Sequence, residues 1–234
     1  MRLKDFYQFC VKEGIREDLR TPKQLREFLR KTKKDQTFFD KEKFVNPYAD
    51  TRILYGDYQC NIKRILIGID IGPAEILLAD RLSQQGQHVD LVLSHHPEGC
   101  AWASFYEVMG LQTDVLSQYG IASQVAEDLM KKRMEEVSRR VHSANHMRTV
   151  DVAKLLNIAL MCCHTPADNH VASYLQRLCD KKKPSTLKNV LDLLRKEPEY
   201  QDASSFNAGP KIILGKPEDS AGKIFVDMTG GTEG

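Results

Sequence analysis

The hydrophobic and polar positions of the chain follow two different periods, which predict alternating strands and helices. Short apolar runs rich in β-branched residues predict strands over 64–70, 89–94 and 159–163. Residues 73–86, between the first two runs, have the spacing of an amphipathic helix. This order predicts a βαβ unit with parallel strands and a right-handed crossover. We therefore expect an α/β fold in which ligands bind beyond the carboxyl ends of the strands.

Segments before and after this βαβ unit also have apolar residues at helical spacing. Residues 3–13 and 22–33 predict two short helices, the second with Thr21 as its N-cap and Pro22 as its first residue. They form a helical N-terminal extension, and residues 35–58 after it show no steady period. Further helices are predicted over 121–141, 151–156, 166–179 and 185–195. The rest of the chain is predicted to form a loop over 197–210 and strands over 211–215 and 223–228.

Composition narrows the class of protein. The chain has 234 residues, of which 41% are hydrophobic and 28% are charged, which is typical of packed globular domains. No apolar stretch reaches the roughly 20 residues of a membrane-spanning helix, and the N-terminus lacks the apolar core of a signal peptide. A net charge of +2 gives no reason to expect a nucleic-acid partner. Six cysteines without a framework spacing predict reduced thiols and a cytoplasmic location.

Two adjacent histidines, His95 and His96, end the second predicted strand. Adjacent residues of a regular strand point to opposite faces, but at a strand end the two rings can diverge and each serve one of two metal ions. Pro97 favours an extended backbone at His96. The pair alone is equally compatible with one ring packed on a helix and the other in solvent.

A second motif, His164 followed by Asp168, ends the third predicted strand. With Thr165 as N-cap and Pro166 as the first helical residue, Asp168 lies one helical turn from His164 at the carboxyl edge of the sheet. Alternatively, Asp168 completes a capping box with Thr165. Three imidazoles and one carboxylate at the same edge of one sheet favour a divalent-metal site. Without a metal, a separate structural role for each of these side chains would have to place all of them at the same edge by chance.

Other polar groups are expected to have structural roles. Cys162 and Cys163 are predicted to pack in the buried strand rather than bind metal. Glu98 is expected to be a solvated loop carboxylate, and His146 is a candidate for a supporting group near the metal. The glycine-rich segment 229–234 lacks the GK[ST] sequence of a phosphate-binding loop.

The segments VDLVLSHHP after RILIGID, then CHTPADNHV, then FVDMTGG, resemble in this order the NIF-three-like family, also described as GTP cyclohydrolase I type 2 homologues. The resemblance starts at ILYGD and covers roughly residues 53–234, which leaves residues 1–52 as a helical extension outside it. It implies a layered α/β/α fold with a mixed sheet and a dinuclear metal centre. It also implies that the protein assembles with itself into a toroidal hexamer.

The resemblance assigns metal ligands residue by residue. The family's SHH motif matches His95 and His96, and its HTxxD motif matches His164 and Asp168. The remaining His and Glu ligands of the family are expected beyond Gly234, so we expect this chain to lack that end and to hold its ions with fewer protein ligands. The implied cofactors are up to two divalent ions of Zn, Fe or Mn.

Two functions are compatible with these residues. One is a metal-dependent hydrolase of a nucleotide-like or phosphorylated small molecule, in which the metal lowers the pKa of a water molecule. The other is a non-catalytic metal-binding scaffold or regulatory protein. Strand-end ligands with positions open to water favour the hydrolase, because structural metal sites are usually closed. No motif for a base or a phosphate identifies the substrate.

Overall fold

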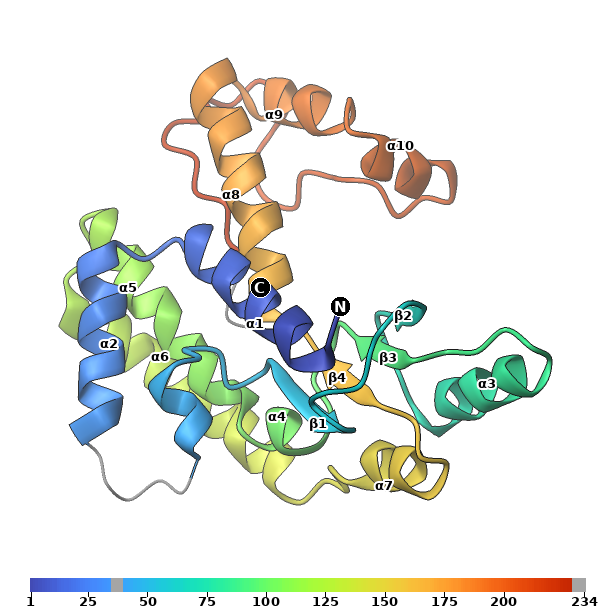
Figure 1. Cartoon of the computed structure of the whole chain (residues 1–234). Coiled ribbons are helices and arrows are strands. Elements are labelled where there is room, and N and C mark those ends of the chain that lie inside the picture. The colour runs from blue at the N-terminus through green and yellow to red at the C-terminus, as the bar shows by residue number, and fades with distance from the viewer. Residues whose placement is uncertain (35–39, 229–234) are drawn as a thin grey trace. The chain divides into compact units, whose positions relative to one another are not determined.

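The computed structural model describes residues 1–34 and 40–228, and the core of the fold is a four-stranded mixed sheet (Figure 1). Its strands are β1 (Arg52–Tyr55), β2 (Ile65–Gly68), β3 (Leu91–Ser94) and β4 (Leu160–Cys162), in the spatial order β1-β4-β3-β2. Strands β2, β3 and β4 are parallel, and β1 runs antiparallel to β4. The predicted α/β class and its βαβ unit are therefore confirmed.

Helices account for most of the remaining regular structure. The α-helices of the described residues are α1 (Leu3–Arg16), α2 (Pro22–Lys34), α3 (Pro73–Gln84), α4 (Gly99–Ala103), α5 (Gly110–Gln118), α6 (Ser123–His142), α7 (Arg148–Leu155), α8 (Thr165–Lys182), α9 (Leu187–Leu194) and α10 (Pro198–Ser205). Two short 3-10 helices are η1 (Lys41–Phe44) and η2 (Phe105–Met109). Within the described part of the chain, no helix combines the length and apolar character that crossing a membrane requires.

Alternate residues of the central strands enter two different hydrophobic layers. Val92 and Leu160 pack in a cluster formed with α3 and α7, whereas Leu91 and Met161 pack in a cluster formed with α1. All four side chains are completely buried. Because successive strand residues point to opposite faces, this alternation shows that helices cover both faces of the sheet. The expected α/β/α layering is confirmed, and α1 supplies one of its outer layers.

The chain divides into two compact units. The first contains Met1–Val171 and Met228, and the second is Ala172–Asp227. Helices α1 and α2 thus fall in the same unit as the sheet. In the second unit, the Gln176 side chain donates to the carbonyl of Ile224 at 3.2 Å and accepts from the Val226 N–H at 2.9 Å. These bonds fasten the irregular segment after α10 to α8.

Several elements differ from the sequence prediction. Strand β1 forms within the segment predicted to be irregular, and α10 forms within the predicted loop, where Pro198 is its first residue. The strands predicted over 211–215 and 223–228 are wrong, because neither segment has strand conformation. Ile213 is 89% exposed, and no described strand lies beside these segments to pair with their backbone groups. An apolar run without a partner strand does not form a sheet.

Candidate metal centre

The ends of the parallel strands bring the three predicted histidines together. His95 and His96 follow β3, and His164 follows β4, which pairs directly with β3. The backbone N–H groups of His95 and His96 donate to the carbonyls of Gly68 and Ile69, each at 2.9 Å. The two histidines therefore continue the pairing with β2 past the end of β3, which fixes their backbone at the carboxyl edge of the sheet.

The side chains of His95, His96 and His164 form a compact group, the histidine cluster. The ring centroids of His95 and His164 are 4.6 Å apart, those of His95 and His96 are 5.2 Å apart, and those of His96 and His164 are 5.8 Å apart. One ring nitrogen from each side chain lies within 4.8 Å of the other two. Both rings of the adjacent pair thus face His164, and the three residues can hold a metal ion.

Asp168, in the first turn of α8, adds a carboxylate to the histidine cluster. Its Oδ1 is 3.5 Å from Nε2 of His95, and its Oδ2 is 3.5 Å from Nδ1 of His164. Burial raises the pKa of Asp168 to about 6, because the charged carboxylate loses its hydration. The alternative capping box is wrong, because α8 already begins at Thr165 and the Asp168 N–H donates to the carbonyl of His164 at 3.2 Å. The Thr165 hydroxyl donates to Asp50 at 2.5 Å.

Two carboxylates that were not among the predicted site residues hold the rings. Asp50 Oδ2 lies 3.1 Å from Nδ1 of His164, and Asp70 Oδ1 lies 2.6 Å from Nδ1 of His96. A carboxylate on Nδ1 fixes the ring and leaves Nε2 available to a metal. The signal for Asp70 is its place at the end of the first predicted strand. Asp50 precedes β1, and its role follows only once β1 is known to run antiparallel to β4.

Asp50 is fully buried and its acceptor positions are used. Besides the Thr165 hydroxyl, it accepts the hydroxyl of Thr51 at 3.2 Å. The Thr51 oxygen in turn accepts the backbone N–H of His164 at 3.2 Å. The two residues before β1 are thus bonded to both the backbone and the ring of His164, so Asp50 positions this ring within the histidine cluster.

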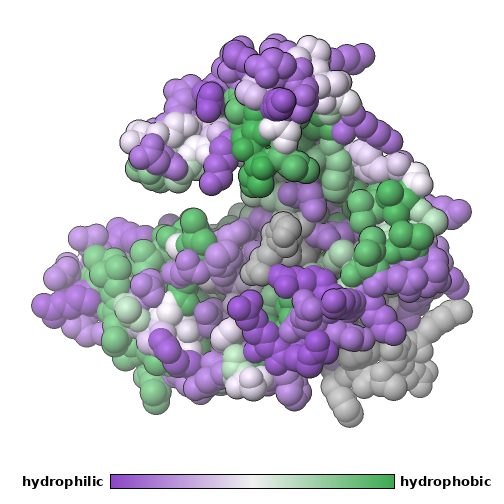
Figure 2. All heavy atoms as spheres, turned by 180° about the vertical axis from the view of Figure 1, so that it is seen from behind, coloured by the Kyte–Doolittle hydropathy of each residue, from purple (hydrophilic) through white to green (hydrophobic). Residues whose placement is uncertain are grey.

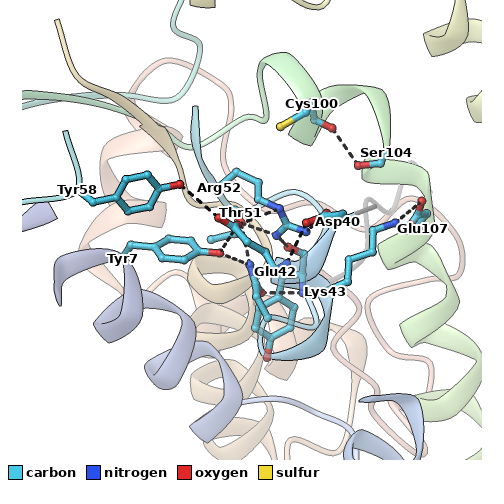
Figure 3. Close-up of polar contacts among 12 residues, drawn as sticks. Tyr7, Asp40, Glu42, Lys43, Thr51, Arg52, Tyr58, Cys100, Ser104 and Glu107 are labelled. Atoms are coloured by element: carbon cyan, nitrogen blue, oxygen red, sulfur yellow. Dashed lines mark hydrogen bonds and ion pairs between the residues drawn. The ribbon is translucent and has the colours of Figure 1, made fainter. Parts of the chain in front are cut away.

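A buried polar group around Arg52 anchors the segment that carries Asp50 (Figure 3). The Arg52 guanidinium pairs with Asp40 at 3.1 Å and with Glu42 at 3.3 Å. Glu42 also accepts the hydroxyl of Tyr7, which comes from α1, at 3.0 Å. Because buried charges are stable only when they are paired, these contacts fix the path of the chain from η1 into β1.

The surroundings of the rings determine their protonation. Burial lowers the pKa of His95, and the neighbouring His164 and His96 lower it further, which favours the neutral imidazole that binds metals. Burial also opposes a charge on His164, but the hydrogen bond and the negative charge of Asp50 outweigh it and raise the pKa of His164. A proton on Nδ1 of His164 is therefore stabilised by Asp50.

The spacing and chemistry of these donors fit a divalent cation. With metal–ligand bonds of about 2.1 Å, two ligand atoms of a tetrahedral site lie about 3.4 Å apart. The 3.5 Å between His95 Nε2 and Asp168 Oδ1 matches this separation and exceeds the roughly 2.7–3.2 Å of a direct hydrogen bond. Imidazole and carboxylate together suit Zn, Fe or Mn. The His96 side chain is 50% exposed, so the cluster is open to water on that side.

A second concave region of the described structure has no histidine or cysteine that could bind a metal ion. A cavity of about 760 Å³ lies among α2, α5 and α6. No histidine or cysteine lines it, and two of its charged side chains, Glu27 and Lys31, lie 3.7 Å from each other. The histidine cluster is therefore the stronger candidate for a functional site.

The remaining groups named from the sequence fall outside the cluster. Cys162 is completely buried in β4, which confirms that it packs in the strand. Glu98, expected to be solvated, is half-buried, and burial raises its pKa. The ring Nε2 of His146 lies 2.8 Å from the carbonyl of Val141, which gives this histidine a structural role. The glycine-rich segment 229–234, including the end of FVDMTGG, lies outside the described residues.

Comparison with solved structures identifies a relative. The chain is similar to a NIF3 superfamily protein from Sphaerobacter thermophilus, with 28% sequence identity and a TM-score of 0.64. The similarity covers 75% of this chain and 62% of the other chain, so this chain spans about three fifths of the length of that relative. No protein-family model matches the chain, and a comparison with curated proteins finds no match.

Proposed function

Because this chain has the NIF3-like fold, we propose that it is a divalent-metal-binding protein whose ligands are His95, His96, His164 and Asp168. The observation that carries this proposal is the arrangement of the donors. Three ring nitrogens lie within 4.8 Å of one another, and an oxygen of the buried Asp168 carboxylate lies 3.5 Å from Nε2 of His95. Such spacing leaves room for a cation among the side chains. Two ions, as the family resemblance implies, are the expected maximum.

We further infer that the protein is a metal-dependent hydrolase of a nucleotide-like or phosphorylated small molecule. A bound divalent ion would act as a Lewis acid and lower the pKa of a water molecule. The residues of the chain contribute orientation, since Asp50 and Asp70 hold Nδ1 of His164 and His96. The half-exposed ring of His96 leaves an approach for a small substrate.

Metal content and affinity test the ligand assignment. We expect purified protein to contain Zn, Mn or Fe by elemental analysis, and the metal-free protein to bind Zn or Mn in calorimetry. His95→Ala and Asp168→Ala should each weaken binding at least tenfold while circular dichroism shows an intact fold, because each variant removes a ligand atom. His88→Ala is the matched control, since this side chain is 76% exposed and pairs only with Asp90 in the described structure. Equal affinity in all variants would refute the assignment.

Turnover distinguishes the hydrolase from a non-catalytic metal-binding protein. The metal-loaded protein should hydrolyse at least one member of a panel of nucleotides and phosphate monoesters. The activity should disappear with a chelator and return when Mn or Zn is added. Bound metal without chelator-sensitive turnover on the whole panel would instead support a scaffold or regulatory role.

We also propose that the chain assembles with itself, as the family resemblance implies for a hexamer. Edge strand β2 and the residue after its end expose Ile67 and Ile69 to 67% and 64%. Leu77 and Leu78 of α3 are also exposed, and Figure 2 shows hydrophobic residues gathered where α3 lies. Exposed apolar groups on a sheet edge favour association. Light scattering at micromolar concentration measures the mass, and a monomer would contradict this proposal.

A further inference from the structure

The cavity of about 760 Å³ lies within the unit Met1–Val171, where α2, η2, α5 and α6 line it (Figure 1). Its volume falls in the range of about 300–1,000 Å³ that is usual for small-molecule sites. Neither the histidine cluster nor Asp168 contributes to its lining. The cavity is therefore a second place, separate from the candidate metal centre, where a ligand can bind.

Two aromatic rings and two thioethers line part of this cavity. Phe28 comes from α2, Tyr106 comes from η2, and Met130 and Met134 come from successive turns of α6. All four residues are half-buried, so part of each is still open to a ligand. Aromatic rings attract cations over their faces, and methionine side chains adapt to ligands of irregular shape. These residues suit an apolar group that carries a positive charge.

The charged residues of the lining differ in their exposure. Among those that line the cavity in the described structure, only Asp114 of α5 is half-buried. The others are all exposed: Glu27, Lys31, Glu127, Lys131, Glu135 and Arg139. Exposed charges are hydrated and screened, whereas a half-buried charge interacts more strongly with a ligand. Asp114 is therefore the charged group of the lining that matters most for the choice of ligand.

Asp114 has no cation of its own. Within residues 1–34 and 40–228, no side chain forms a hydrogen bond or an ion pair with its carboxylate. Burial raises the pKa of Asp114, although the positive charges of Arg20 and Lys31 act in the opposite direction. Both of these cations already have partners, since Arg20 lies 2.8 Å from Asp18 and Lys31 lies 3.7 Å from Glu27. A cationic ligand would supply the partner that Asp114 lacks.

We propose that this cavity binds a small organic amine in its protonated form, with the ammonium group at Asp114 and the apolar body against Phe28, Tyr106 and the two methionines. The carboxylate accepts a hydrogen bond from the ammonium group, and a bond between two charged groups is stronger than one between neutral groups. The lining has four carboxylates and three cationic side chains, which favours a cation over an anion. This inference does not depend on the proposed metal function, because none of the proposed metal ligands lines the cavity.

Three indole probes that differ only in the group at the end of the side chain test the proposal in calorimetry with the full chain at neutral pH. Tryptamine ends in an ammonium group, tryptophol in a neutral hydroxyl group and indole-3-acetate in a carboxylate. We expect tryptamine to bind about tenfold more tightly than tryptophol, because only the ammonium group forms a charged pair with Asp114. Indole-3-acetate should bind most weakly. The affinities should be the same with and without a chelator, which separates this site from the metal site.

Variants test the role of Asp114. Asp114→Asn should lower the affinity for tryptamine to that for tryptophol and leave the affinity for tryptophol unchanged. Glu127→Gln is the matched control, because Glu127 lines the same cavity but is exposed, so the affinity for tryptamine should change less than about twofold. In hydrogen exchange, tryptamine should protect peptides of α5 and α6 and not those at the ends of β3 and β4.

The proposal is overturned if tryptamine does not bind at millimolar concentration, or if it binds no more tightly than tryptophol. It is also overturned if Asp114→Asn, with a native circular dichroism spectrum, binds tryptamine as tightly as the unmodified protein, or if Glu127→Gln weakens binding as much. The comparison of the three probes on the unmodified protein decides the outcome even if the Asp114 variant does not fold.

Discussion

Asp168 is a ligand candidate whose charge reduces the stability of the metal-free protein. Its folded pKa of about 6 lies above the 3.8 of an ordinary aspartate because the carboxylate is buried. The proton is thus bound more tightly in the folded state than in the unfolded state. Its contribution to the free energy of unfolding is complete below the unfolded pKa and is lost as the pH rises through about 6. A shift of about two pKa units corresponds to ~3 kcal/mol.

Asp168→Asn should therefore stabilise the metal-free protein at pH 7.5 by ~1–3 kcal/mol, since the amide is never charged. Near pH 4 the variant and the unmodified protein should unfold at similar urea concentrations. With Zn present the order should reverse at pH 7.5, because only the unmodified protein retains the carboxylate ligand. A destabilised variant at pH 7.5 without metal would show that the pairing of Asp168 with His164 outweighs its burial.

Asp50 acts on the metal site without being a ligand in this arrangement. Replacement Asp50→Asn keeps the size of the side chain but weakens the interaction that holds Nδ1 of His164. Loss of such a supporting carboxylate typically lowers metal affinity about 10- to 100-fold, and calorimetry with Zn measures this change. Asp70→Asn should have a smaller effect, because the Asp70 side chain is 87% exposed and water competes for its hydrogen bond. Equal effects of the two variants would argue against a special role for Asp50.

At the scale of elements, the contact of α1 with the start of α8 depends on Gly14. Gly14→Ala would favour the helix by about 1 kcal/mol. However, the added methyl group would lie 2.6 Å from the Cβ of Pro166, and overpacking of this kind typically costs about 1–3 kcal/mol. We expect net destabilisation of the protein in urea. Lys12→Ala, on the exposed side of α1, is the control and should leave the free energy of unfolding within about 0.5 kcal/mol. An equally stable Gly14→Ala variant would show that α1 can move away.

Elements with their own periodic signal are predictable from the sequence. The βαβ unit and the helices that correspond to α1, α2 and α8 follow from hydrophobic spacing and N-terminal proline signals. Strand β1 is as long as β2 and β3, but it begins with a buried arginine and so lacks the apolar run that marks those strands in the sequence. The apolar runs 211–215 and 223–228 have the composition of strands but lack a partner, which local sequence cannot reveal.

The residues of the candidate site also divide into those that the sequence predicts and those that only the folded sheet reveals. His95, His96, His164 and Asp168 were predicted because each follows a recognisable strand or starts a helix after it. Asp50 is 114 residues from His164 in the sequence, and no spacing rule connects them. The pairing arises from the antiparallel arrangement of β1 and β4, which is a property of the assembled sheet.

At the scale of the whole molecule, the proposed ligands are confined to one of the two compact units. The histidine cluster, Asp168 and the supporting Asp50 all lie within Met1–Val171. The unit Ala172–Asp227 has its own hydrogen bonds, such as the one that the Leu187 N–H donates to the carbonyl of Asp219 at 3.0 Å. Metal binding should consequently stabilise the first unit directly, because a ligand stabilises the structure that opens when its site is lost.

Hydrogen exchange measured by mass spectrometry should reveal this division. Saturating Zn added to the metal-free protein should slow amide exchange in peptides that contain the ends of β3 and β4 and the first turn of α8. Peptides that cover α9 and α10 should exchange at the same rate with and without Zn, because none of the proposed ligands lies in them. Asp168→Ala provides the control, since its exchange pattern should respond only weakly to Zn. Protection of α9 and α10 equal to that of the strand ends would show that the two units unfold together. The two compact units would then not differ in their response to metal.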